Sequence, residues 1–378
     1  MNASSHHYYR VLVGRASATY DLAADLDTLT IDDEAGRPSR LEVRAPDPYR
    51  VLSQAVREGM DVTVELGSTT DHEVVFRGFV TRVEGDFPED AIPTISVVAH
   101  DRRARLGLRE RSRRLPNQRL SDVVREVARS HFSQVEVDVP GDPDFDINGI
   151  RQPGISDLRF LLALAEEFQC QLLLERRGDE DVLRFVSLET LYRQEPALTM
   201  HYQRAHVDHL LLSFRPVVDI AELRLPIARM AIDAQSAEQP EVQQSTAEPP
   251  TVHDDSGDDG FSRLQADAPE RALRLLPLRA AAQEVEQTMI RELGTVRLGE
   301  APPFLTPEQA SERGSNRVAH RLLGMRARGR SRGLPSLRAS QIANIQDVGA
   351  RFSGNWYLTS VRHVVDGSGY HTELECER

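Results

Sequence analysis

The last 27 residues, 352–378, constrain the fold of this chain more than any other stretch. Two apolar and aromatic runs, 356–365 and 370–376, flank the sequence Asp-Gly-Ser-Gly, which is typical of a tight turn because glycine tolerates positive φ. This pattern predicts a β-hairpin. An isolated hairpin is only marginally stable, so it should complete a sheet begun earlier. Alternation predicts two faces for the first strand, one with Trp356, Leu358 and Ser360 and the other with Tyr357, Thr359, Val361 and His363.

The composition describes a folded protein with several domains. A chain of 378 residues exceeds one ordinary hydrophobic core, and 40% hydrophobic with 28% charged residues is a globular balance. The start, MNASSHHYYR, lacks the features of a secretory signal, and no apolar run is long enough to span a bilayer. We therefore expect cytoplasmic synthesis and no membrane contact. Cys170 and Cys376 lack a second cysteine at metal spacing, so we expect two buried, reduced thiols.

Negative charge is concentrated in one stretch of the chain. The net charge is −13, and residues 233–260 contain eight acidic side chains and no arginine. This stretch lacks aromatic residues and is rich in proline, glutamine, serine and glycine, so it cannot bury enough apolar surface to offset the entropy of ordering. We expect an acidic disordered insertion over 233–264, followed by a helical segment rich in arginine and alanine over 265–339.

The rest of the chain divides into β-rich and mixed parts. Residues 1–105 contain short apolar runs with period-two alternation, such as 41–45, separated by turn sequences, which predicts a first β-barrel. Residues 106–200 mix helical and strand patterns, which predicts an α+β domain. Residues 201–232 and 340–378 are the predicted parts of a second β-barrel. The expected fold class is α+β, mainly β: two small antiparallel β-barrels, an α+β domain between them and a helical insertion.

Two helices are expected in the α+β domain. Ser121 is the predicted N-cap of a helix that continues as DVVREVARSHF, and Ser156 is the predicted N-cap of a helix over 158–170. Apolar side chains recur on one face of the second helix, so we expect that face to be buried: Phe160, Leu161, Leu164 and Phe168.

Three segments share their order and spacing with a known pattern. They are Gly36-Arg37-Pro38 followed by LEVRAPDP and VELG…FRGFV, the segment QPGISDLRFLLALAEEFQCQLLLE, and the terminal FSGNWYLTSVRH…GYHTEL. Together they resemble the phage late control D family, the VgrG-like baseplate hub proteins of contractile tails and injection systems. The resemblance implies a homotrimer whose six barrels form a pseudo-sixfold ring, joining a hexameric inner tube to a trimeric spike. No further domain follows the hairpin here, so we expect the spike tip and any hydrolase to be separate chains.

No catalytic, cofactor-binding or metal-binding residue is predicted. His206 and His209 offer two metal ligands, but on a strand they would point to opposite faces. The run Asp142–Asp146 lacks the glycine and terminal glutamate of an EF-hand loop, which favours an ordinary polar loop. Glu166 and Glu167 are adjacent, so on a helix they diverge by roughly 100° and are poorly placed to flank one glycosidic bond.

Two groups of arginines stand out. They have three interpretations: solvated loops or pairing with carboxylates, a subunit or tube interface, and nucleic-acid binding. The last is disfavoured because the net charge is negative and no aromatic residues interleave with the arginines. The groups are Arg102, Arg103, Arg105, Arg109, Arg111, Arg113 and Arg114, and Arg326, Arg328, Arg330, Arg332 and Arg338.

These features predict a structural baseplate hub that is not an enzyme. The expected partners are two further copies of the chain, a trimeric spike protein, a hexameric inner tube protein and other baseplate proteins, without nucleic acid or membrane. The expected location is the cytoplasm on synthesis and then a phage tail or injection particle. The alternatives are a spike-associated cell-wall hydrolase, which the missing catalytic patterns oppose, and a carbohydrate-binding β protein, which the single tryptophan opposes.

Overall fold

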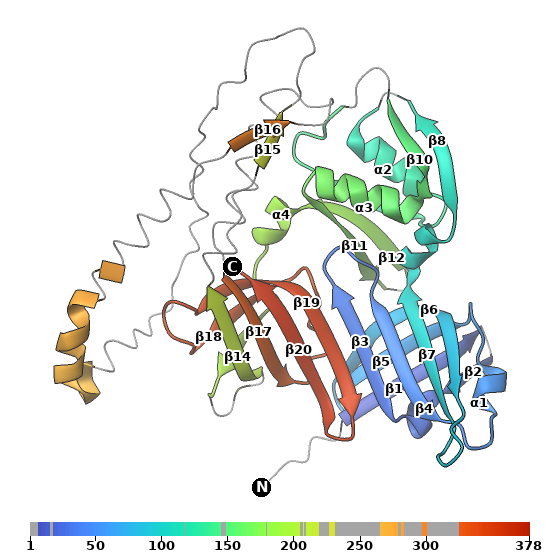
Figure 1. The fold of residues 1–378 in the computed structure, drawn as a ribbon, viewed down its shortest axis with the longest axis horizontal. Coiled ribbons are helices and arrows are strands. Elements are labelled where there is room, and N and C mark those ends of the chain that lie inside the picture. The colour runs from blue at the N-terminus through green and yellow to red at the C-terminus, as the bar shows by residue number, and fades with distance from the viewer. Residues whose placement is uncertain are drawn as a thin grey trace.

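The computed structural model describes residues 7–15, 18–116, 118–144, 149–178, 180–204, 207, 209–218, 227–230, 265–278, 281–282, 297–300 and 325–378. Thirteen strands form one large sheet, and a smaller mixed unit lies against it (Figure 1). The chain is mainly β, as the sequence predicts. The predicted acidic insertion over 233–264 lies outside the described residues, so that expectation stays a prediction.

The N-terminal unit supplies seven strands of the large sheet, in the order β3-β4-β7-β6-β5-β1-β2. Burial alternates along these strands, and the inward side chains, Val11, Leu41 and Val64 among them, share one hydrophobic core. The strands are β1 His7–Arg15, β2 Ala18–Asp21, β3 Thr28–Glu34, β4 Arg40–Pro46, β5 Asp61–Ser68, β6 His72–Asp86 and β7 Thr94–Asp101. Three short helices accompany them: η1 Leu22–Asp25, α1 Leu52–Ala55 and η2 Arg102–Gly107.

The C-terminal unit is a closed six-stranded barrel. Its ring runs β18-β13-β14-β17-β20-β19 and closes because β18 also pairs with β19. The neighbours are antiparallel except that β13 pairs in parallel with both β14 and β18, which corrects the expectation of a purely antiparallel barrel. The strands are β13 Leu198–Tyr202, β14 Leu210–Val218, β17 Met325–Arg332, β18 Ile342–Gln346, β19 Gly354–Asp366 and β20 Gly369–Glu377.

The predicted terminal hairpin is confirmed as β19 and β20, but the predicted faces of β19 are wrong beyond Leu358. The register shifts between Leu358 and Ser360, so one extra residue reverses the alternation there. Val361 therefore joins Trp356 and Leu358 in the barrel core instead of facing away from them. Sequence alternation alone does not reveal such a bulge.

The prediction of a helical segment over 265–339 is wrong for β17, a barrel strand between β14 and β20. Its sequence MRARGRSR has a period of two, with arginines outward and small residues inward. Small side chains leave room for the large core residue Leu374, which lies 3.0 Å from the position a Cβ of Gly329 would take. Helical turns do occur at 269–278. The barrel also begins earlier than predicted, because β13 starts at Leu198 rather than after residue 200.

The two β units are joined edge to edge. β19 pairs antiparallel with β3 from Ser360 opposite Glu34 to Val365 opposite Leu29, so the sheet runs on from the barrel into the N-terminal unit (Figure 1). Among the described strands, no hydrogen-bonded ladder joins β3 to β1 or β2. Closure of the predicted first β-barrel, over residues 1–105, therefore stays a prediction.

The mixed unit contains two small sheets and three helices, whereas the sequence predicts only two of these helices. β8 Glu110–Leu115 pairs with β10 Ile150–Ser156, and β11 Cys170–Arg177, β12 Glu180–Ser187 and β9 Gln134–Asp138 form a three-stranded sheet. The helices are α2 Leu120–Ala128, α3 Asp157–Glu167 and α4 Leu188–Tyr192. A separate parallel pair consists of β15 Ile227–Met230 and β16 Arg297–Glu300.

One of the two predicted helix caps is confirmed. The Ser156 hydroxyl oxygen accepts a hydrogen bond from the backbone N–H of Arg159 at 3.3 Å, so it caps α3. Ser121 is not the N-cap of α2, because the helix starts at Leu120 and its N-cap is Arg119, two residues before Ser121. The carboxylate of Asp142 instead accepts from the backbone N–H of Ser121 at 2.9 Å and from its hydroxyl at 2.8 Å. A loop residue distant in sequence thus supplies the cap.

Replacing Leu164 by alanine should lower the free energy of unfolding by ~2–5 kcal/mol, because Leu164 is 5% exposed and packs with Phe160 and Leu161 in the core of the mixed unit. Urea unfolding followed by circular dichroism measures the change. Leu108→Ala is the matched control, since Leu108 is 68% exposed and should change stability by less than about 0.5 kcal/mol. Equal effects of the two substitutions would contradict the packing. The expected burial of Phe168 is only partly correct, because that ring is half-buried at the end of α3.

Candidate functional site

The described residues contain no group of three or more His, Cys, Asp or Glu side chains placed to hold a metal ion. His206 lies outside the described residues, and Nδ1 of His209 lies 3.2 Å from the carbonyl oxygen of Thr199. Glu166 is exposed on α3, and Glu167 is half-buried. The absence of catalytic, cofactor and metal residues in the whole chain stays a prediction.

A buried polar network joins the three structural units. The Arg103 guanidinium, 4% exposed, donates from Nε and Nη2 to the Asp101 carboxylate, with Nη2 2.7 Å from Oδ2. Its Nη1 donates to the carbonyl oxygen of Leu172 on β11 at 2.8 Å. Its Nη2 also donates to the hydroxyl of Ser39, whose own hydroxyl donates to Asp33. This side chain therefore connects the N-terminal unit to the mixed unit.

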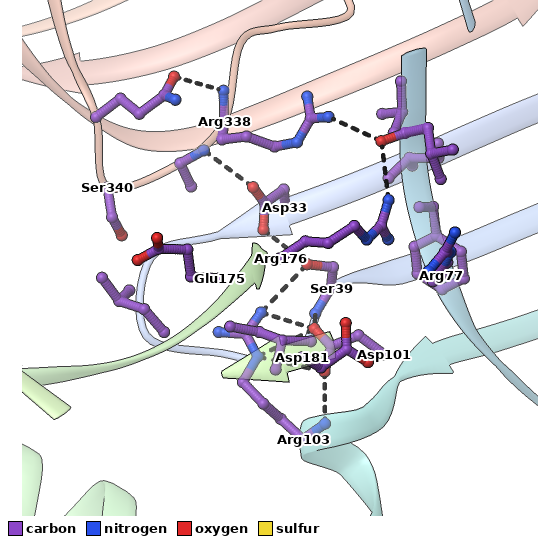
Figure 2. A pocket seen from close by; sticks show the side chains of 18 of the residues that line it. Asp33, Ser39, Arg77, Asp101, Arg103, Glu175, Arg176, Asp181, Arg338 and Ser340 are labelled. Carbon is purple, nitrogen blue, oxygen red and sulfur yellow. Dashed lines mark hydrogen bonds and ion pairs between the residues drawn. The ribbon is translucent and has the colours of Figure 1, made fainter. Parts of the chain in front are cut away.

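The network continues into the barrel. The Asp33 carboxylate accepts from the backbone N–H of Ala339, in the loop between β17 and β18, at 2.9 Å. Burial alone disfavours the charged form of Arg103, but the Asp101 carboxylate outweighs it and raises the pKa of Arg103 above its ordinary value. The guanidinium is thus held charged at the meeting point of the three units (Figure 2).

A second set of contacts fixes the mixed unit on the barrel. The Gln171 side-chain oxygen accepts from the hydroxyl of Tyr357 at 2.6 Å and from that of Ser340 at 2.8 Å. The Tyr192 hydroxyl donates to the Glu377 carboxylate at 2.5 Å. The Tyr357 side chain of β19 points away from the barrel core and packs with apolar residues of α4 and β12. Because Trp356 and Tyr357 are adjacent on β19, their side chains lie on opposite faces of the strand: Trp356 faces the barrel core and Tyr357 faces the mixed unit.

A cleft of about 680 Å³ opens beside this network. It is lined by β3, β6, β11, β12 and the β17–β18 loop, so all three units contribute to its wall (Figure 2). Three arginines of this wall are Arg77 on β6, Arg176 on β11 and Arg338 in the loop. Nη1 of Arg176 and Nη2 of Arg338 both donate to the carbonyl oxygen of Val74, at 3.3 and 3.4 Å. Two guanidinium groups therefore share one carbonyl group, in a cleft whose wall also carries carboxylates such as Glu73, Glu175 and Asp181.

The first predicted arginine group mostly pairs with carboxylates of the same chain. Nε of Arg111 and Nη2 of Arg113 lie 3.4 and 2.8 Å from the carboxylate of Asp157, which is 1% exposed at the start of α3. Nε of Arg102 lies 3.2 Å from Asp181. Pairing with carboxylates is therefore the confirmed interpretation for these three arginines.

The β17 arginines of the second group form a charged outer face of the barrel. Their partners across the ladder are glutamates of β20, with Arg326 opposite Glu377, Arg328 opposite Glu375 and Arg330 opposite Glu373. Nε of Arg328 lies 2.8 Å from Glu375, and this pair is well exposed, so it contributes only about 0–1 kcal/mol to stability. The sequence signal for this face is the alternation of arginine with small residues.

Sequence reasoning missed both the buried network and the cleft. Their residues come from chain positions as distant as Asp33, Arg103, Arg176 and Arg338, and no spacing pattern relates them. The one available signal was that Arg103 follows Asp101 at the end of an apolar strand. Among the described residues, every helix is too short or too polar to span a bilayer.

Comparison with known proteins places this fold among tail proteins. No family model and no curated protein matches the sequence. The 43 kDa tail protein of prophage MuSo2 from Shewanella oneidensis matches with a TM-score of 0.63 at 15% identity, covering 98% of each chain. The tail protein from Neisseria meningitidis MC58 matches with a TM-score of 0.61 at 12% identity, covering 98% of this chain and 96% of that one.

A secretion protein shares the same fold. The E. coli c3393 protein, a component of the type VI secretion system with structural similarity to the T4 tail proteins gp27 and gp5, matches with a TM-score of 0.57 at 11% identity. The match covers 97% of this chain and 76% of that one. The chain therefore has the fold of phage tail proteins and VgrG-like components, which confirms at the level of the fold the resemblance carried by its sequence.

Proposed function

We propose that this protein is a structural baseplate hub of a contractile tail or injection system. The observation that carries the proposal is the match of the whole chain, from end to end, to two tail proteins of nearly equal length. The sequence motifs that resemble the hub family support it independently. In this role the chain is a homotrimer that presents two β units per copy, six in all, to a hexameric inner tube ring, and its threefold centre receives a trimeric spike.

The internal construction supports a rigid adaptor. The β3–β19 ladder and the Arg103 network connect the two β units, so their relative orientation is set within one chain. An adaptor between a sixfold tube and a threefold spike requires a fixed orientation, because the contacts with the tube and the contacts with the spike must form at the same time. We infer that the protein is not an enzyme. Incubation with purified peptidoglycan and a glycan-array experiment test the hydrolase and carbohydrate-binding alternatives directly.

The purified protein should be a trimer, alone or after addition of its spike partner, because a hub subunit has interface surface that only neighbouring copies cover. Multi-angle light scattering measures the mass against the 42.4 kDa of one chain. A stable monomer both with and without the spike would contradict the proposed assembly. The genes flanking this one identify the spike and tube chains to use.

A further inference from the structure

The outer surface of the barrel carries more cationic than anionic side chains over β14, β17, β20 and β19. Its arginines are the four of β17, together with Arg215 on β14 and Arg362 on β19. Its carboxylates are four in number: Asp366, Glu373, Glu375 and Glu377. We call Arg215 and the four β17 arginines the arginine face, since they lie side by side at the β14 end of this surface.

Three arginines of this face have no carboxylate partner among the described residues. Arg328 pairs with Glu375 at 2.8 Å. Arg215, Arg330 and Arg332 are exposed, and no carboxylate of the described part of the chain lies within 4.0 Å of their guanidinium nitrogens. Arg215 also lies directly opposite Arg328 in the β14–β17 ladder, and like charges in that position destabilise a sheet. The arginine face therefore favours additional anionic groups.

The other carboxylates of this surface have partners of their own. Oδ1 of Asp366 accepts from the backbone N–H and the hydroxyl of Ser368, at 2.8 and 2.6 Å. These hydrogen bonds lower the pKa of Asp366, and the charge of Arg330 adds a smaller contribution. Glu377 is engaged with the mixed unit, and Glu373 lies 3.8 Å from a histidine of its own strand. The anions already present thus compensate the arginine face only in part.

The chain itself carries a complementary anion. The acidic segment, residues 233–260, has eight carboxylates and no arginine, and it belongs to the connection between β14 and β17. That connection leaves β14 at Val218 and returns to β17 at Met325, which are partners in the ladder, so both of its ends start at the arginine face. Asp233 is 15 residues beyond Val218, and such a stretch reaches up to ~50 Å, whereas the eight residues of β17 span only ~26 Å.

We propose that the acidic segment docks on the arginine face of its own chain, through ion pairs between its carboxylates and Arg215, Arg330 and Arg332. Tethering at both ends favours this occupant over a free partner, because it keeps the local concentration of the segment high. Guanidinium groups bind carboxylates in pairs of parallel hydrogen bonds. Charge attraction of this kind needs no single fold of the segment. The proposal is independent of the hub function.

A nitroxide spin label on the full-length variant Ser256→Cys tests the docking, because Ser256 lies between two pairs of aspartates of the acidic segment. Cys170 and Cys376 are 6% and 2% exposed, so the label should react with the new cysteine alone, which the unchanged chain verifies. At ~10 mM salt we expect an immobilised component in the electron paramagnetic resonance spectrum. At ~1 M salt, where screening is strong, that component should disappear.

The double variant Arg330→Gln/Arg332→Gln should lower the ratio of immobilised to mobile label about tenfold at low salt, since it removes two surface ion pairs. The matched control is Arg82→Gln/Arg129→Gln, which removes the same charge from exposed arginines on β6 and α2 and should leave the ratio unchanged. A label that is mobile at low salt, or that stays immobilised at high salt, would overturn the proposal. Equal spectra of the two double variants would also overturn it, and would assign the arginine face to another partner.

Discussion

Replacing Arg103 by methionine should lower the free energy of unfolding by ~3–5 kcal/mol. Arg103 and Asp101 are 4% and 3% exposed, so the substitution leaves a carboxylate buried without its cation. It also leaves the carbonyl oxygen of Leu172 without the donor that now lies at 2.8 Å. Methionine keeps most of the volume of the side chain, so the loss measures the charge and hydrogen bonds rather than a cavity. Urea unfolding of the purified variant gives the value.

Two controls make this result specific. Arg328→Met removes an exposed ion pair and should cost no more than ~1 kcal/mol. The double variant Arg103→Met/Asp101→Asn should recover part of the loss, because no unpaired charge remains buried. If Arg103→Met is no more destabilising than Arg328→Met, the network does not hold the three units together.

Replacing Trp356 by alanine in the wild-type chain should lower the free energy of unfolding by ~3–5 kcal/mol, which is the range for truncating a large aromatic side chain in a core. Trp356 is fully buried in the barrel, and its ring meets that of Phe214 edge to face at 5.3 Å. The indole N–H of Trp356 donates to the carbonyl oxygen of Phe352 at 2.9 Å, so the alanine variant also leaves that carbonyl oxygen without its donor.

The comparison for Trp356 is an aromatic side chain on the surface. Tyr49 is 86% exposed, and Tyr49→Ala should change stability by less than about 0.5 kcal/mol. Thermal unfolding of both variants, followed by near-ultraviolet circular dichroism, distinguishes the barrel core from the surface. A melting temperature of Trp356→Ala equal to that of Tyr49→Ala would show that the hairpin is not part of a packed barrel.

Local patterns determined much of the secondary structure. The glycine-flanked turn before Gly369, the period-two burial of β4 and β5 and the Ser156 cap of α3 follow from short-range rules, because each depends on residues within a few positions of one another. β17 could also have been recognised, since its arginines alternate strictly with small residues. The arginine-rich composition of the whole segment favours a helix. The period of two within β17 indicates a strand, and the structure has a strand there.

The sequence by itself thus determined most of the strands, the turns, one of the helix caps and the resemblance to tail hubs. Only the tertiary structure decided the bulge that turns Val361 into the barrel, the cap supplied by Asp142, and the joining of β3 to β19. It also decided which arginine became the buried junction and which ones line the cleft. These features depend on contacts between residues far apart in the chain, whose energies come from burial and pairing in three dimensions and leave no periodic trace along the sequence.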